Sequence, residues 1–211
     1  FEDPRLPDAE RIKAVIGSAE HQQTNLELAR ESVALLRNDG ALPFAANKAK
    51  RIAVVGPLAD DAQNQLGDWA GSSGQVGWMP DGHPRGMITT ILDGFKQLAP
   101  EGCEVAYSRG ANIIDLVDDP EGEFYPDGQP RPKLAVSAKF DQQLLDEAVE
   151  NARRSDLVVA VVGDVVQLVG ETCSTATLEL LGGQNAMLEA LADVARETGK
   201  PLVDVLSLIH I

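Results

Sequence analysis

The sequence predicts an α/β fold, a doubly wound and mainly parallel sheet with helices on both faces. Six apolar residues, 157–162, follow one another without alternation, which is typical of a strand buried on both faces of a parallel sheet. A second compact run rich in β-branched residues lies at 51–56. Segments with helical spacing of apolar residues separate such runs, and this alternation predicts crossover connections and parallel strands.

Length and composition restrict the class of protein. The chain has 211 residues, enough for one full domain and an additional segment. Its 44% hydrophobic and 24% charged residues are ordinary for a globular protein, and no apolar run approaches the ~20 residues of a transmembrane helix. The net charge of -15 repels phosphate backbones. We therefore expect neither nucleic acid nor a membrane as a partner.

The predicted elements begin with a polar leading segment and a helix. Residues 1–22 contain two prolines and no strong period, which is typical of a connecting segment. Residues 23–37 place apolar side chains largely on one helical face, so we expect an amphipathic helix there. The Asn-Asp-Gly turn at 38–40 should end it.

Residues 51–56 are expected to form the first strand of the sheet. Their apolar, β-branched run ends at Gly56, as in the opening of a dinucleotide-binding fold. That fingerprint needs further glycines two and five residues later, where this chain has Leu58 and Asp61. The sequence therefore favours a structural strand over a nucleotide site.

The glycine-rich segment 67–86 holds both tryptophans, Trp69 and Trp78, together with His83. Aromatic side chains on such loops stack on sugar rings, but a tryptophan that pins a long loop to its domain is at least as common. Both interpretations stay open at this point. The three histidines lie far apart and show no metal-ligand spacing, so no metal site is expected.

The middle of the chain predicts a further helix and strand, then an excursion and another helix. Helical spacing at 87–98 precedes a short strand at 104–107. Residues 110–139 contain four prolines and an acidic run, and we expect an irregular surface excursion with a solvated acidic face rather than a calcium loop. Residues 140–153 predict a helix that leads to the strand at Asp156.

The strand from Asp156 carries the candidate chemistry. Gly163 ends its apolar run, and the loop that follows contains Asp164 and Glu171. Two carboxylates thus lie just past the carboxyl end of a buried strand, where open α/β sheets usually bind their ligands. Two glycines then precede a helix expected at 184–198, and residues 202–206 predict the next strand.

At this point the chain resembles a known family, the C-terminal α/β-sandwich domain of family-three glycoside hydrolases, the β-glucosidase and β-xylosidase group. No single motif is diagnostic, but their succession over about 200 residues is specific. The matching stretches are Ala-Arg-Glu-Ser-Val-Ala-Leu-Leu-Arg-Asn-Asp-Gly (29–40) with Leu42-Pro43, and residues 51–57, 66–69, 107–112, 155–163, 182–184 and 198–201.

The resemblance implies an active site in two parts. A preceding (β/α)8 barrel would supply the nucleophilic aspartate, and this domain would supply the general acid/base on a loop. Glu171 is the acid/base candidate, because it follows Val-Val-Gly after seven residues and precedes Ser174 by three. Asp164, Ser174 and Trp69 are candidates for substrate binding or loop support. No cofactor is expected.

The same resemblance implies domain bounds. Residues 1–22 would connect to a barrel that this chain lacks, 23–206 would form a C-terminally truncated α/β sandwich, and 207–211 would be an anomalous tail, so we expect a fragment. Family members often have arginine after the loop serine and proline before Gly-x-Gln, where this chain has Thr175 and Leu181. Asp204 is expected to interrupt the last strand.

We therefore expect the chain to be part of a retaining β-glycosidase that hydrolyses terminal β-linked glucosides or xylosides. Its expected partners are a β-glycoside or oligosaccharide substrate and the barrel domain. The resemblance favours a periplasmic or secreted location and leaves the cytoplasm open. The alternative is a noncatalytic carbohydrate-binding or structural domain that caps a barrel. Without the barrel we expect no activity, since Glu171 alone cannot replace the nucleophile.

Overall fold

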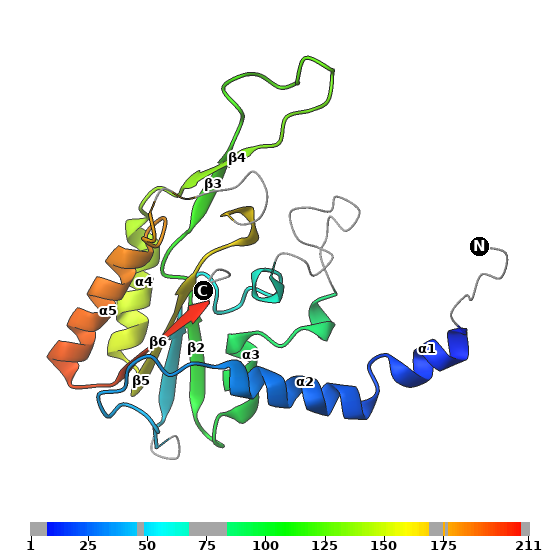
Figure 1. Ribbon diagram of the computed structural model, residues 1–211. Helices are drawn as coiled ribbons and strands as arrows, with labels where there is room; N and C mark the ends of the chain where they lie inside the picture. Colours follow the sequence, from blue (N-terminus) through cyan, green and yellow to red (C-terminus); the bar gives the residue numbers. More distant parts are fainter. Residues whose placement is uncertain (1–7, 46–48, 68–83, 169–174, 176, 208–211) are drawn as a thin grey trace. The chain divides into compact units, whose positions relative to one another are not determined.

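The computed structural model describes residues 8–45, 49–67, 84–168, 175 and 177–207. It divides into two compact units, Phe1–Leu42 and Pro43–Ile211 (Figure 1). The second unit holds every described strand, and it therefore contains the sheet predicted from the sequence.

Four parallel strands form the central sheet. The strands are β1 (Arg51–Val55), β2 (Glu104–Ser108), β5 (Leu157–Gly163) and β6 (Leu202–Ser207). Their order across the sheet is β2-β1-β5-β6, and every pair is parallel. After β2 the chain crosses back over β1, so β5 and β6 lie on the other side of β1 from β2. The doubly wound, mainly parallel sheet predicted from the sequence is confirmed.

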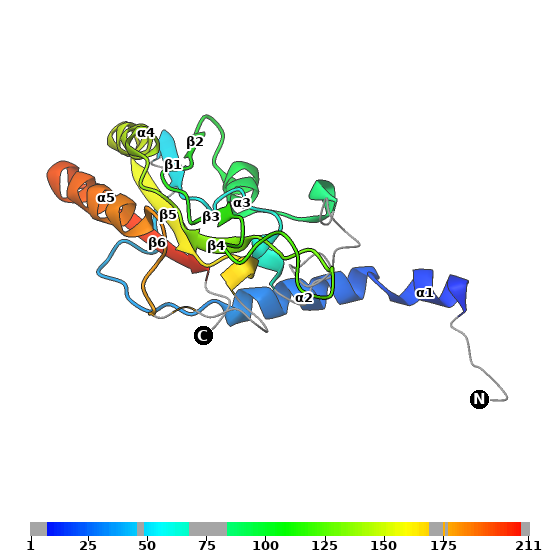
Figure 2. The same ribbon diagram turned by 90° about the horizontal axis from the view of Figure 1, so that it is seen from above.

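Helices cover both faces of this sheet. On one face, Val54 and Val159 pack in a core that includes Leu92 of α3 (Ile91–Leu98). On the other face, Val55 and Val158 share a core with α4 (Gln142–Arg153) and α5 (Gln184–Thr198). Figure 2 shows α3 on one side of the strands and α4 and α5 on the other. All seven residues of β5 are buried, as its uninterrupted apolar run predicted.

Local signals explain where the helices of this unit begin and end. Thr90 and Asp93 form a reciprocal capping box at the start of α3. The helix therefore begins at Ile91, later than the predicted residue 87, and a 3-10 turn, η3 (Arg85–Met87), precedes it. Asp141 caps α4, and α5 ends at Gly199 in the left-handed conformation. The bounds of α5 are those predicted from the sequence.

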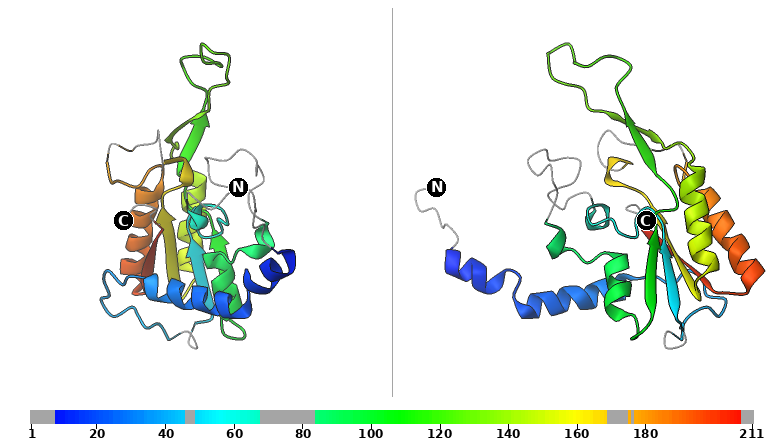
Figure 3. Two further views of the ribbon diagram at one scale, coloured as in Figure 1. Left: turned by 45° about the vertical axis from the view of Figure 1, so that its right-hand side comes forward. Right: turned by 180° about the vertical axis from the view of Figure 1, so that it is seen from behind.

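The excursion after β2 contains regular structure that the sequence analysis missed. Strands β3 (Ile114–Val117) and β4 (Leu134–Ser137) pair antiparallel, so the irregular segment expected at 110–139 is in part a hairpin. Each strand has only four residues with mostly exposed side chains, which leaves no apolar alternation to detect. The hairpin projects away from the main sheet in both views of Figure 3.

The acidic run of this hairpin is partly paired. Arg131 contacts Asp119 at 3.1 Å and Glu121 at 2.8 Å, and its guanidinium lies 4.3 Å from the centre of the Tyr125 ring. These contacts join the two sides of the hairpin loop. Lys133 also pairs with Asp118, at 3.2 Å, so the acidic face is partly neutralised rather than wholly solvated.

The described residues of the first unit form two helices, α1 (Ala9–Val15) and α2 (Ala19–Ser32). The helix α2 begins earlier than the predicted residue 23, because Ser18 caps it by accepting a hydrogen bond from the His21 backbone N–H. It also ends earlier, since Val33 is extended. Neither helix contains a buried residue.

Strand β6 continues through Asp204, so the expected interruption of this strand does not occur. β6 is the outer strand of the described sheet, and Asp204 is exposed on it. Its carboxyl is still partly desolvated by the surrounding strand, which raises the pKa of Asp204. An outer strand tolerates this charge because the side chain keeps access to water.

Candidate functional site

The candidate site lies at the carboxyl edge of the parallel sheet, where β1 and β5 end side by side. Each strand is followed or ended by a glycine with positive φ, Gly56 at 133° and Gly163 at 154°. A Cβ at Gly56 would overlap the carbonyl oxygen of Val161, and one at Gly163 would overlap that of Ser207. Glycine therefore lets each chain leave its strand in close contact with the neighbouring strand.

The loop after β1 is built around Asp61. One carboxylate oxygen accepts hydrogen bonds from the backbone N–H groups of Gln63 (3.0 Å) and Asn64 (2.8 Å). The other accepts one from the Asn64 side-chain amide at 2.6 Å. Asp61 thus fixes both the backbone and the side chain of Asn64.

Asn64 in turn joins this loop to the loop after β5. Its side-chain oxygen accepts a hydrogen bond from the backbone N–H of Val166 at 2.8 Å. Val166 begins a short 3-10 turn, η4 (Val166–Leu168), three residues beyond the end of β5. The loops that follow two neighbouring strands are therefore bonded directly to each other.

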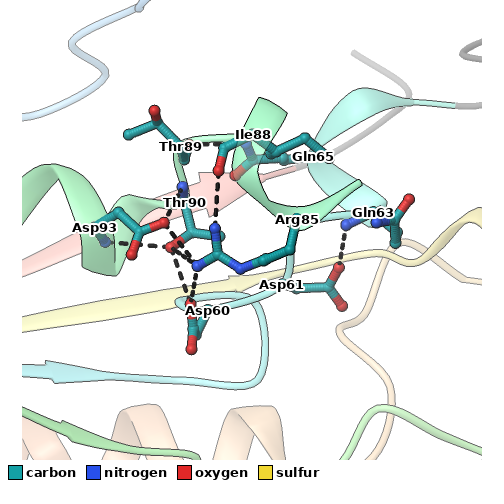
Figure 4. Close-up of polar contacts among 9 residues, drawn as sticks. All are labelled: Asp60, Asp61, Gln63, Gln65, Arg85, Ile88, Thr89, Thr90 and Asp93. Carbon is teal, nitrogen blue, oxygen red and sulfur yellow. Dashed lines mark hydrogen bonds and ion pairs between the residues drawn. The ribbon is translucent and has the colours of Figure 1, made fainter. Parts of the chain in front are cut away.

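Arg85 holds a second polar cluster at this edge (Figure 4). Its guanidinium contacts Asp60 at 2.9 Å and Asp93 at 2.6 Å, and it donates to the carbonyl of Ile88 at 2.8 Å. The Thr90 hydroxyl donates to Asp60 at 3.0 Å. The Thr90 backbone N–H donates a hydrogen bond to Asp93, and this bond is the main cause that lowers the pKa of Asp93. The contact with Arg85 lowers this pKa further.

This cluster connects the segment before α3 to the loop after β1. The side-chain amide of Gln65 adds a hydrogen bond to the carbonyl of Thr89 at 2.9 Å, also drawn in Figure 4. The two anchored stretches, 60–65 and 85–93, flank residues 68–83 in the sequence. The described stretches on either side of residues 68–83 are therefore bonded to each other.

Gln184, the first residue of α5, holds the end of β5 from the other face of the sheet. It is fully buried. Its carbonyl oxygen accepts from the Gly163 N–H at 2.9 Å, and its amide donates to the Gly163 carbonyl at 3.0 Å and to that of Leu181 at 3.1 Å. In the sequence, Gly-x-Gln at 182–184 indicated only the family resemblance. A polar residue at a core position of the helix was the signal for this role.

The structure describes one of the predicted site residues and leaves the others outside its described ranges. Asp164 is half-buried, and its backbone N–H donates to the carbonyl of Ser207 at 3.1 Å. Among the described residues its carboxylate makes no hydrogen bond, so its supporting role stays a prediction. Glu171, Ser174 and Trp69 lie outside the described residues, and their roles stay predictions as well.

Other kinds of site were also sought in the described part of the chain. There, no three His, Cys, Asp or Glu side chains gather in an arrangement that could hold a metal ion. None of the described helices is long and apolar enough to cross a membrane.

Comparison with known proteins finds relatives that match most of this chain. The chain is 34% identical over 190 residues to a periplasmic β-glucosidase of Salmonella typhimurium, a match that covers 88% of this chain and 22% of the relative. It is 31% identical over 204 residues to a β-xylosidase of Formosa agariphila, covering 96% of this chain and 23% of the relative. The chain therefore spans less than a quarter of the length of these relatives.

A solved structure is similar throughout. It is a β-glucosidase from intestinal bacteria that is involved in saponin metabolism, 82% identical, with a TM-score of 0.94 over 99% of this chain and 27% of its own. The family model described as "Glycosyl hydrolase family 3 C-terminal domain" matches residues 33–209, most of the chain. The chain therefore belongs to glycosyl hydrolase family 3, of which it carries the C-terminal domain.

Proposed function

We propose that this chain is the acid/base-supplying part of a retaining β-glycosidase. Glu171 acts as the general acid/base, and a preceding (β/α)8 barrel supplies the nucleophilic aspartate. The observation that carries the proposal is the position of β5 in a family 3 domain. This strand ends at the carboxyl edge of the sheet, and the loop it feeds leads to Glu171 eight residues later.

The relatives support the class of substrate. One is a β-glucosidase of Salmonella typhimurium, another is a β-xylosidase, and the 82% identical protein is a β-glucosidase involved in saponin metabolism. Terminal β-linked glucosides, including glucosides of saponins, are therefore the first substrates to test, and xylosides the second. We also propose that residues 1–22 lead from the barrel. Ser207, assigned to the tail in the sequence-based prediction, is the last residue of β6 and pairs with Gly163, so it belongs to the sheet.

The proposed chemistry needs two carboxyl groups about 5 to 5.5 Å apart. The barrel aspartate attacks the anomeric carbon, while Glu171 gives its proton to the leaving oxygen. Glu171 then takes a proton from the water that releases the sugar, so it serves as acid and then as base. A carboxylate brought close by the barrel would raise the pKa of Glu171 and keep it protonated for the first step.

The second candidate is a noncatalytic domain that caps a barrel and contributes structure or sugar contacts. The polar cluster around Arg85 is compatible with such a role, because it anchors both sides of the glycine-rich segment. The two candidates differ in what removal of the Glu171 carboxyl would do to the chemical step.

The test uses a chimera in which this chain replaces the matching quarter of the 82% identical β-glucosidase. In the chimera, Glu171→Ala should slow hydrolysis of substrates with poor leaving groups by about 10²- to 10⁴-fold. Aryl glucosides with activated leaving groups should be affected much less at the glycosylation step, and added azide should restore part of their turnover.

The matched control is Glu179→Gln, which removes an exposed carboxylate eight residues further along the same region. It should leave both kinds of substrate unaffected. An unchanged rate in the Glu171→Ala chimera would remove this residue from the mechanism and favour the noncatalytic candidate. A chimera without any turnover would count against the assignment of this chain to an active glycosidase.

A further inference from the structure

The last residue of β5 and the turn that follows it are held by two side chains from separate elements. We call residues 163–168 the stem, because the chain passes through them before it reaches Glu171. Gln184 bonds to the stem from α5, and Asn64 bonds to it from the loop after β1. These two side chains come from elements that lie on opposite sides of β5 in the sequence.

Gln184 makes a two-way bond with a single residue of the stem. Its carboxamide accepts from the Gly163 N–H and donates to the Gly163 carbonyl, at 2.9 and 3.0 Å. The side chain is fully buried, so water cannot replace it without rearrangement. Loss of the carboxamide would leave two buried backbone groups of Gly163 without a partner, which is costly.

The orientation of Asn64 is fixed by the chemistry of its neighbour. An ionised Asp61 can only accept hydrogen bonds, so the amide NH2 group of Asn64 must face Asp61, at 2.6 Å. The amide oxygen is then turned toward the Val166 N–H, at 2.8 Å. Asp61 therefore acts through Asn64 on the stem.

We propose that Gln184 and Asn64 are positioning residues that hold the stem in the geometry needed for acid catalysis by Glu171. This inference rests on the proposed function of Glu171. The bond to Gly163 fixes where the chain leaves β5, and the bond to Val166 fixes its direction three residues later. Together they fix the start of the loop that leads to Glu171 in the sequence.

A misplaced acid gives a characteristic kinetic defect. Displacement of a catalytic group by about 1 Å can cost about 10²-fold in rate, but only where the reaction needs that group. A phenyl β-glucoside needs protonation of its leaving oxygen, whereas a 2,4-dinitrophenyl β-glucoside does not. A positioning defect should therefore lower kcat/KM for the first substrate and spare the second.

The first experiment is Asn64→Leu in the chimera. We expect kcat/KM for the phenyl glucoside to fall about 10- to 100-fold and that for the dinitrophenyl glucoside to change by less than about twofold. Asn64→Asp should behave similarly, since two carboxylates would face each other. The double variant D61N/N64D exchanges amide and carboxylate while keeping each hydrogen bond, and it should restore most of the rate.

The second experiment is Gln184→Met, which keeps the volume of the side chain and removes its polar atoms. We expect the same selective loss with the phenyl glucoside. Leu191→Ala is the matched control, because Leu191 is fully buried on the same helix and packs in the same core without any bond to the stem. It should lower the melting temperature and leave the ratio of the two kcat/KM values unchanged.

The outcomes separate the inference from the function on which it rests. Equal losses with both substrates in Asn64→Leu, or failure of D61N/N64D to restore the rate, would overturn the positioning role and leave a structural one. If Glu171→Ala shows the selective defect and Asn64→Leu does not, only this inference fails. If Glu171→Ala itself lacks the defect, the proposed function fails.

Discussion

The side-chain oxygen of Asn64 accepts a hydrogen bond from the backbone N–H of Val166 across 102 residues of sequence. The contact forms because β1 and β5 are parallel neighbours, so the loops that follow them leave the sheet at the same edge. The loop proposed to carry the acid/base is thus tied at its start to the loop after the first strand. Stability and catalysis at this edge are expected to depend on the same few contacts.

Gly163→Ala should destabilise the 211-residue chain by about 3 kcal/mol or more, because φ is 154° and a Cβ would overlap the Ser207 carbonyl oxygen. Gly94→Ala is the matched control. Gly94 lies within α3, and a Cβ there meets nothing within 4 Å. This change should stabilise by about 0.5–1 kcal/mol. Urea denaturation measures both, and equal effects would contradict the steric argument.

Thr90→Ala should cost about 1–2 kcal/mol of unfolding free energy, since the hydroxyl caps α3 and also donates to Asp60. The neighbouring Thr89 is exposed, and Thr89→Ala should change stability by less than about 0.5 kcal/mol. Urea denaturation of the pair tests the capping box. A loss at Thr89 as large as that at Thr90 would show that the cap is not the cause.

The hydrogen bonds of Asp156 should make the free energy of unfolding depend on pH. Its carboxylate accepts from the backbone N–H groups of Lys50 (2.8 Å) and Arg51 (3.1 Å), and these bonds lower the pKa of Asp156. The folded-state pKa therefore lies below the unfolded value of about 3.9. The stabilisation is present above about pH 4 and is lost as the pH falls through the folded-state pKa.

Asp156→Asn should accordingly destabilise the chain at pH 7, and the difference from the wild type should shrink as the pH falls through the folded-state pKa, because the wild-type carboxyl then becomes protonated too. Denaturation curves at several pH values measure this convergence. The exposed Glu189 of α5 provides a control, because Glu189→Gln should shift stability by less than about 0.5 kcal/mol at pH 7. A penalty for Asp156→Asn that is the same at every pH would contradict the assignment.

The isolated 211-residue chain is expected to show no glycosidase activity. A general acid cannot replace a nucleophile held about 5.5 Å away, and the proposed nucleophile belongs to a barrel. An assay with an aryl β-glucoside, compared with the chimera at the same concentration, checks this. Turnover above background in the isolated chain would overturn the two-part mechanism.

The isolated chain should also melt at a low temperature with a broad transition. Among the described strands, β6 pairs with β5 alone, and Leu206 on β6 is 43% exposed. An outer strand with exposed apolar side chains gains little from burial. Calorimetry of the chain measures the transition, and a sharp transition at high temperature would show that the fold is more self-sufficient than expected.

The amino-acid sequence by itself determined the main sheet. The uninterrupted apolar run of β5 indicated burial on both faces, and helical spacing indicated α5 with its final bounds. These signals are local, because burial of a strand or helix leaves a period of two or 3.6 residues, or an unbroken run, in neighbouring positions. The family resemblance could also be recognised from the sequence alone, because it depends on a succession of short motifs in a fixed order.

Tertiary structure decided what holds the candidate site together. The Asn64 bond to Val166, the Gln184 bonds to Gly163 and the pairing of Arg85 with Asp60 join residues that are 102, 21 and 25 positions apart. The β3–β4 hairpin was likewise missed, because its short strands are mostly exposed. Hydrogen bonds between distant polar groups leave no periodic signal, since their geometry exists only once the parallel strands bring separate loops to one edge of the sheet.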